Sequence, residues 1–242
     1  MNEITKLSII IPAYNEAATI ARVLDKVMHV ELAHGIVKEI LVVNDASTDQ
    51  TPAALAKYQE EHAGTPLRVI SHGQNKGKGA AIRTGIAQAQ GECVIIQDAD
   101  LEYDPNEYNI LLNPVLEGAA DAVYGSRFMG GNPHRILFFW HTIGNRFLTL
   151  FSNIATNLNL TDMETGYKLF RTDVLRKLTL REDRFGFEPE VTAKLARIPG
   201  VRIYEVGISY YGRTYAEGKK IRWADGFAAL WCIIKYGFFR FP

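Results

Sequence analysis

The sequence predicts a doubly wound α/β fold, in which helices cover both faces of a mostly parallel sheet. Short runs rich in β-branched residues alternate with stretches of helical spacing through the first half of the chain. The chain has 242 residues, of which 47% are hydrophobic and 22% are charged, which suits a globular domain with a sizeable core. The expected strands are Leu7 to Ile11, Glu39 to Val43, Leu67 to Ser71, Cys93 to Gln97 and Ala122 to Gly125. The expected helices begin near Glu16, Thr51, Gly77 and Pro105.

Charge and cysteine content narrow the class of protein. Lys plus Arg equals Asp plus Glu at 27 each, so the chain lacks the overall basic charge typical of nucleic-acid binding. The two cysteines, Cys93 and Cys232, have neither metal-ligand spacing nor a disulfide-rich pattern, which indicates a reducing cytoplasm. The first residues enter a strand without the features of a secretory signal.

Ligands of such sheets bind beyond the carboxyl ends of the strands, and the residues there are polar. The first strand ends in the sequence PAYNE, where Pro12 restricts the chain and Asn15 or Glu16 can begin the next helix. The second ends in NDASTD, where Asp45 can accept a hydrogen bond from a base or ribose, while one of residues 47–49 caps the following helix. For each of these two motifs alone, helix capping is a sufficient explanation.

The third and fourth strand ends carry charge suited to a phosphate and a metal ion. The sequence NKGKG places Lys76 and Lys78 at a helix start, where N–H groups and cationic side chains favour phosphate, although the Walker spacing is absent. The fourth strand ends in Asp98, Asp100 and Glu102, whose oxygens suit a hard divalent cation that bridges them to a diphosphate. Nucleotide-sugar chemistry is the function that this combination indicates.

Taken together, the four strand ends resemble those of the family 2 glycosyltransferases of GT-A type. Within that family the chain is most similar to the polyprenyl-phosphate sugar transferases, namely the dolichol-phosphate mannose synthase group and its glucosyl relatives. The resemblance extends from about Lys6 to Lys220 and includes four further segments: Gly125 to Arg127, Asp162 to Arg171, Phe185 to Glu190 and Tyr211 to Lys220.

The resemblance implies roles for individual residues. The donor nucleotide sugar would be bound by Pro12, Tyr14, Glu16, Asp45, Lys78 and Asp98. Asp98 and Asp100 would hold Mg²⁺ or Mn²⁺, with Glu102 as a further ligand where close relatives often have Gln. The acceptor phosphate would be faced by Arg127, Arg213 and Lys168, and an exposed ion pair is the alternative for Arg127. The residues expected to carry catalysis are Asp98, Asp100, Arg127, Asp162, Lys168 and Arg213.

A segment at about residues 133–158 predicts an acceptor-side helix. At 3.6 residues per turn, Arg135, Thr142, Arg146 and Asn153 fall on one face among many large apolar residues. For an ordinary globular protein such a helix would simply be core. Two arginines on a buried face would need partners, and an acceptor phosphate would supply one for Arg135 and Arg146.

The carboxyl end, residues 221–242, predicts an amphipathic helix that lies in the membrane interface beside a catalytic domain of residues 1–220. Its aromatic residues neighbour basic ones, and no run approaches the roughly 18 uncharged residues that a spanning helix requires. The expected location is therefore peripheral, on the cytoplasmic face of the membrane. A C-terminal helix packed on the domain, or a homodimer surface, are the alternatives.

The predicted reaction is the metal-dependent transfer of a hexose, with inversion, from a GDP-mannose or UDP-glucose type of donor to a polyprenyl phosphate. Because the acceptor oxygen is already anionic, positioning and charge neutralisation would carry the rate. If the acceptor is instead a sugar hydroxyl, as in polysaccharide or glycan synthesis, Asp162 or Glu188 would act as the base. A nucleotide-sugar-binding scaffold without turnover is a third hypothesis, and a nucleotidyltransferase is disfavoured because its glycine-rich loop is absent before Lys76.

Overall fold

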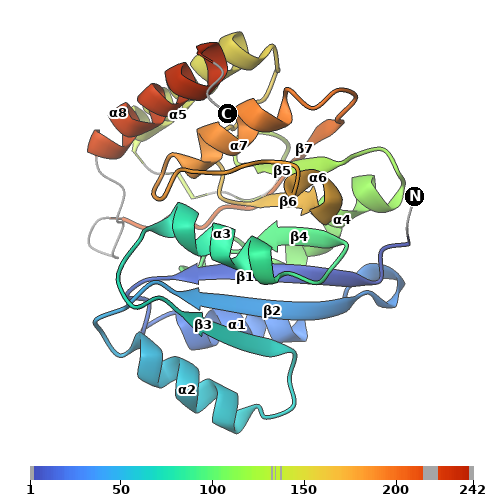
Figure 1. The fold of residues 1–242 in the computed structure, drawn as a ribbon, viewed down its shortest axis with the longest axis vertical. Coiled ribbons are helices and arrows are strands. Elements are labelled where there is room, and N and C mark those ends of the chain that lie inside the picture. The colour runs from blue at the N-terminus through green and yellow to red at the C-terminus, as the bar shows by residue number, and fades with distance from the viewer. Residues whose placement is uncertain (1–2, 132, 134, 137, 215–222, 240–242) are drawn as a thin grey trace.

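The computed structural model describes the whole chain except residues 1–2, 132, 134, 137, 215–222 and 240–242. Its centre is a seven-stranded sheet with the strand order β3-β2-β1-β4-β6-β5-β7 (Figure 1). The strands are β1 Lys6–Ala13, β2 Val37–Asn44, β3 Leu67–Ser71, β4 Cys93–Ile96, β5 Ala122–Ser126, β6 Lys168–Arg171 and β7 Ile203–Gly207. The α-helices are α1 Ile20–His29, α2 Thr51–Glu61, α3 Lys78–Gln88, α4 Tyr108–Leu116, α5 Phe139–Thr156, α6 Thr172–Leu175, α7 Phe187–Leu195 and α8 Trp223–Cys232. Short 3₁₀ turns lie at Ala33–Gly35 and Pro105–Glu107, and a π-helix follows α8 at Ile233–Phe238.

The sheet is covered on both faces, as the alternation of strands and helices predicts. Alternate residues of β1 point to opposite faces, so Ile9 and Ile11 contribute to one core cluster and Ile10 to the other. Helices α1, α2 and α4 pack in the first cluster, whereas α3, α6 and α7 pack in the second. All five predicted strands are present, and β1 to β4 pair in parallel.

Two strands were not predicted. Strand β6 pairs antiparallel with both β4 and β5, and β7 pairs in parallel with β5. Strand β6 is a four-residue segment, KLFR, that lies in the Asp162 to Arg171 motif, and its pairing partners lie about 45 and 75 residues earlier in the chain. Local periodicity does not detect so short a strand, because its stability comes from neighbours distant in sequence.

Two helix boundaries differ from the prediction. Helix α1 begins at Ile20 rather than near Glu16, and residues 17–19 form a turn before it. The acceptor-side helix, expected from about residue 133, is α5 and begins at Phe139. Arg135 therefore lies before the helix, and the predicted stripe that joins it to Arg146 is wrong.

The orientation of α5 also differs from the prediction. The residues that α5 buries are Thr149 and Ser152, and Arg146 is exposed. Many large apolar side chains of this segment are exposed, with Ile136 83%, Trp140 67% and Leu150 60% exposed, whereas Leu148 and Phe151 pack against the second core cluster. A buried arginine face is therefore absent from α5, and an exposed apolar surface takes its place.

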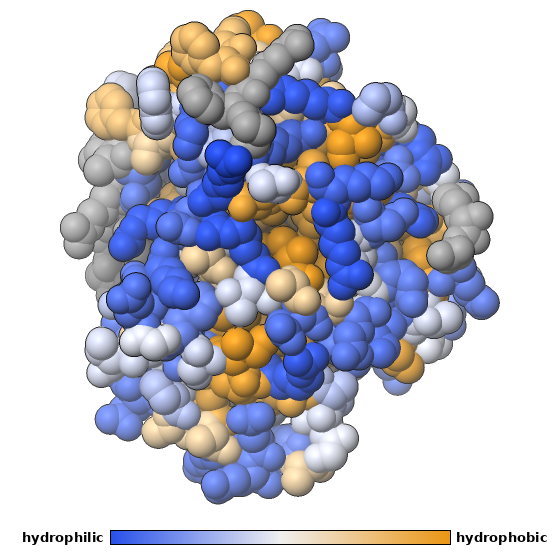
Figure 2. Space-filling view, viewed as in Figure 1, coloured by the Kyte–Doolittle hydropathy of each residue, from blue (hydrophilic) through white to orange (hydrophobic). Residues whose placement is uncertain are grey.

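Helix α8 lies beside α5 at the end of the molecule opposite α2 (Figure 1). It packs on the domain through Ala229 and Cys232, while Phe227 and Trp231 are 74% and 60% exposed. In Figure 2 hydrophobic residues reach the surface at this end of the molecule. None of the helices formed by the described residues is long and apolar enough to cross a membrane. The basic residues expected to flank α8, at 219–222 and at Arg240, lie outside the described residues.

Candidate active site

The loops after β1 and β2 bind each other at the carboxyl edge of the sheet. The Asn15 N–H donates to Ser47 Oγ at 3.0 Å, and Asn15 Oδ1 accepts from the Thr48 N–H at 2.8 Å. The Glu16 N–H donates to Thr51 Oγ1 at 2.8 Å. These polar residues, for which helix capping alone was a sufficient explanation, therefore join two strand ends and fix one wall of the site. Helices α1 and α2 lack side-chain caps at their N-cap positions.

Asp45 organises the next loop. Its buried carboxylate accepts hydrogen bonds from the N–H groups of Lys76 and Gly77 at 2.9 and 2.6 Å and from Asn75 Nδ2 at 2.9 Å. His72 Nδ1 lies 2.6 Å from Asp45 Oδ1. Gly77 has a φ of 103°, and a Cβ there would lie 2.4 Å from the carbonyl oxygen of residue 183, so only glycine fits. The NKGKG sequence is thus held in one conformation at the start of α3.

A cavity of about 530 Å³ opens at this edge of the sheet, and we call it the donor cavity. The six residues predicted to bind the donor, Pro12, Tyr14, Glu16, Asp45, Lys78 and Asp98, all line it. So do Asp100, Glu102, Arg127, Glu188 and Arg213. The predicted donor residues, which are up to 86 positions apart in the chain, are therefore brought to one place.

Lys78 lies at the N-terminus of α3 and faces two carboxylates. Its Nζ is 2.8 Å from Asp98 Oδ1 and 3.3 Å from Glu188 Oε1. Burial alone would lower the pKa of Lys78, but the charges of Asp98 and Glu188 outweigh it and raise the pKa above its ordinary value. Lys78 is therefore a permanent cation beside a helix N-terminus, which is an arrangement that binds phosphate.

Arg213 pairs with the acidic side chains after β4. Its Nη2 lies 2.7 Å from Asp100 Oδ2, and its backbone N–H donates to Glu102 Oε1 at 2.8 Å. Burial, together with repulsion from Asp98 and Glu102, raises the pKa of Asp100 to about 7 despite Arg213. A divalent cation would relieve repulsion of this kind, and carboxylate oxygens are ligands that Mg²⁺ and Mn²⁺ prefer.

The three predicted metal ligands are not gathered as a set of three. Asp98 faces Lys78, Asp100 faces Arg213, and Glu102 accepts from the Tyr210 hydroxyl at 2.7 Å. Across the described ranges, no group of three or more His, Cys, Asp or Glu side chains is arranged to hold a metal ion. A metal site at Asp98, Asp100 and Glu102 remains a prediction.

Arg127 is held by a bidentate ion pair with Asp162. Nε and Nη2 of Arg127 lie 2.6 and 2.7 Å from the two carboxylate oxygens of Asp162, and the Arg127 N–H donates to Oδ2 at 3.1 Å. Asp162 is fully buried, which would raise its pKa, but Arg127 outweighs burial and the pKa is lowered. Asp162 does not line the donor cavity. Its contribution to the site is therefore to fix the orientation of Arg127.

Lys168 does not face a cavity. It is fully buried on β6, and its ammonium donates to the carbonyl oxygens of Met163 at 3.0 Å and of Thr165. The expectation that Lys168 faces the acceptor phosphate is therefore wrong, because the antiparallel strand β6 turns the side chain into the domain. Lys168 instead holds the 163–165 turn, which lies beside the site.

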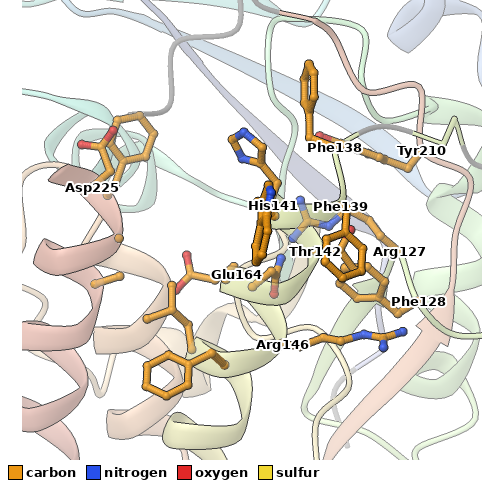
Figure 3. A pocket seen from close by; sticks show the side chains of 18 of the residues that line it. Arg127, Phe128, Phe138, Phe139, His141, Thr142, Arg146, Glu164, Tyr210 and Asp225 are labelled. Carbon is orange, nitrogen blue, oxygen red and sulfur yellow. The ribbon is translucent and has the colours of Figure 1, made fainter. Parts of the chain in front are cut away.

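A second cavity of about 640 Å³, which we call the apolar cavity, is lined largely by residues of α5 and α8 (Figure 3). Most of its wall is apolar and comes from α5, α8 and the segment before α5. Three of the four arginines predicted for the acceptor, Arg127, Arg135 and Arg146, line it. The fourth, Arg213, lines the donor cavity and not this one.

The two cavities adjoin, because five residues line both. These are Arg127, Glu164, Phe185, Tyr210 and Asp225. The Arg127 guanidinium lies 5.2 Å from the centroid of the Tyr210 ring. This contact helps to fix the orientation of Arg127 where the two cavities meet. The sequence motifs contain Glu164 and Phe185, but no spacing rule assigned them a role. Tyr210 directly precedes a recognised motif and was missed.

The fold and the arrangement of the strand ends define the GT-A class. The crystal structure of Mycobacterium tuberculosis glucosyl-3-phosphoglycerate synthase with Mn²⁺, uridine diphosphate and phosphoglyceric acid superposes with a TM-score of 0.73. The two chains are 21% identical, and the match covers 97% of this chain and 79% of the other. This likeness confirms the predicted GT-A fold.

The family follows from the sequence. Residues 8–179 match the family described as Glycosyl transferase family 2, and the chain therefore belongs to that family and is a glycosyltransferase. A dolichyl-phosphate beta-glucosyltransferase from Trichomonas vaginalis is 27% identical over 89% of this chain and 68% of its own length. A dolichol-phosphate mannosyltransferase from Pyrococcus furiosus is 26% identical over 89% of this chain and 60% of its own length. The resemblance predicted from the strand ends is confirmed.

Proposed function

We propose that this glycosyltransferase transfers a hexose, with inversion, from a nucleoside diphosphate sugar to a polyprenyl phosphate. The observation that carries the proposal is the junction of the two cavities. A charged donor cavity at the strand ends shares Arg127 with an adjoining apolar cavity that carries two further arginines. A phosphate attached to a long apolar chain is the acceptor that matches such a surface.

Lys78 and the N-terminus of α3 would bind the donor diphosphate. Asp98 and Asp100 would hold the divalent cation, which when bound neutralises charge on the leaving diphosphate. Lys78 and Arg213 pair with these carboxylates, and both cations would also be available to phosphate oxygens of the donor. Several M. tuberculosis glucosyl-3-phosphoglycerate synthase structures contain uridine diphosphate with Mn²⁺ or Mg²⁺, which supports this assignment.

Arg127 would bind the acceptor phosphate. Its ion pair with Asp162 uses Nε and Nη2, and we assign Nη1 to the phosphate. An acceptor phosphate is already ionised near neutral pH, so Arg127 need only orient it toward the anomeric carbon on the side opposite the leaving group. The names of two relatives, a dolichyl-phosphate beta-glucosyltransferase and a dolichol-phosphate mannosyltransferase, indicate acceptors of this kind for those proteins.

The apolar surface on α5 and α8 would rest on the membrane that contains the acceptor. Phe139, Trp140, Phe147 and Trp231 are each more than half exposed, and exposed aromatic residues favour the headgroup region. In this arrangement residues 1–220 form the catalytic domain and the helix that begins at Trp223 lies at the interface on the cytoplasmic face. A homodimer that covers the same surface is the alternative.

The direct test is transfer of label to lipid. The protein would be incubated with Mg²⁺ or Mn²⁺, labelled GDP- and UDP-sugars, and phytanyl phosphate, and the organic phase would be counted. Metal-dependent labelling of the lipid is expected, together with its loss in Asp100→Ala. Labelling of a free glycan but not of lipid would favour the sugar-hydroxyl reaction with Glu188 as base, since Glu188 lines the donor cavity. Nucleotide-sugar binding without any transfer would favour a scaffold.

A further inference from the structure

Glu164 stands where the donor and apolar cavities meet. It lies on the turn between Asp162, which holds Arg127, and Gly166, where an added Cβ would lie 2.5 Å from Asp98 Oδ2 and 3.2 Å from Lys78 Nζ. It lines both cavities. In the view of Figure 3 its carboxyl group lies between Asp225 and Arg127. Glu164 is therefore one of the five residues placed to contact ligands in both cavities.

One oxygen of Glu164 lacks a partner in the protein. Oε1 is buried, and it is the only buried side-chain oxygen or nitrogen among the described residues that makes no hydrogen bond. A buried polar atom left unpaired is costly, and such atoms in folded proteins generally receive a ligand or water. Because Glu164 lines both cavities, this oxygen is placed to accept a hydrogen bond from a bound ligand or water, or to donate one to it.

The charge state of Glu164 indicates which kind of ligand it accepts. Burial and the charge of Glu188 on α7 raise its pKa to about 8, although Lys168 on β6 and Arg127 after β5 act in the opposite direction, and Asp162 raises it further. A carboxyl group that is largely protonated at neutral pH both donates and accepts hydrogen bonds. Hydroxyl groups complement it in both respects, whereas the phosphates of donor and acceptor already have Lys78 and Arg127.

We propose that Glu164 binds a hydroxyl group of the sugar during its transfer and contributes to the choice of sugar. The inference rests on the proposed function, because it requires a nucleotide sugar in the donor cavity. In this proposal Glu164 contacts the sugar, whereas other residues hold the nucleotide, the diphosphate and the acceptor phosphate. Glu164 differs from a structural residue in that its contribution depends on which hydroxyls the sugar carries.

Calorimetric binding with Mn²⁺ tests this role. Wild type, Glu164→Ala, Glu164→Gln and the control Glu60→Ala, on the exposed side of α2, would each be titrated with the nucleoside diphosphate and with its sugar form. Glu164→Ala should bind the sugar form about three- to tenfold more weakly and bind the bare diphosphate as wild type does. Glu164→Gln, whose amide also donates and accepts, should retain most of the affinity for the sugar form.

Monodeoxy donors identify the hydroxyl group. For the donor that lacks the hydroxyl bound by Glu164, wild type and Glu164→Ala should bind equally, and for the other deoxy donors the difference should persist. Equal loss with every deoxy donor, or weaker binding of the bare diphosphate by both Glu164 variants, would overturn the role of Glu164. If the wild-type protein binds no nucleotide sugar at all, the proposed function itself fails, which is a separate result.

Discussion

Gly166→Ala is expected to displace the carboxylate of Asp98, a proposed metal ligand, without changing any charge. A Cβ at Gly166 would lie 2.5 Å from Asp98 Oδ2 and 3.2 Å from Lys78 Nζ. Ordinary contacts are about 3.5 Å, so the Asp98 carboxylate must shift by about 1 Å. Gly166 does not have a positive φ, so the backbone accepts alanine. The substitution therefore isolates the position of Asp98 from its charge.

A misplacement of about 1 Å at a reacting centre can cost about 100-fold in rate. We expect kcat/KM for lipid labelling to fall by this order and the Mn²⁺ concentration for half-maximal activity to rise. The melting temperature should change little, because the clash is with the end of one side chain. Gly73→Ala is the matched control, since a Cβ there has no atom within 4 Å. Wild-type activity and metal dependence in Gly166→Ala would refute the placement of Asp98 at the metal.

Three further predictions concern the partner of Arg127, the protonation of Glu164 and the exposed apolar surface. Asp162→Asn should lower the free energy of unfolding by about 3 kcal/mol, measured by urea denaturation, because it leaves the partly buried Arg127 without its counter-charge; a loss under 1 kcal/mol would contradict this. The raised pKa of Glu164 means that its protonated form contributes stability that is complete below about pH 4.5 and lost as the pH rises to about 8. Glu164→Gln should therefore gain melting temperature over wild type between pH 5 and pH 8.5, and a constant difference would count against it. Replacing both Trp140 and Trp231 with Ala should weaken binding to anionic vesicles about tenfold in a sedimentation assay, whereas Val37→Ala, which is also at an exposed position, should not; unchanged binding would favour a dimer surface.

Much of the site could be read from the sequence because it is built from segments that are each continuous. Strands β1 to β5 are apolar runs with local periodicity, and each donor residue lies at the carboxyl end of one of them, within three residues after it, or at the start of the next helix. In a parallel sheet the carboxyl ends of the strands share one edge, so recognising the strands was enough to place Pro12, Asp45, Lys78 and Asp98 together. The family resemblance rests on the same four segments.

The tertiary structure decided what depends on contacts between distant residues. The short antiparallel strand β6 turned Lys168 inward, and the ion pair with Arg127 made Asp162 a support rather than part of a cavity wall. The exposure of large apolar side chains on α5 could not be predicted from the sequence either. An apolar helix has the same sequence pattern whether its large side chains face a core or an exposed surface. The sequence by itself therefore determined the order of the elements and the chemistry at their ends. Only the tertiary structure decided where the side chains point and that the two cavities adjoin. Both depend on packing between distant segments, which a local sequence pattern does not describe.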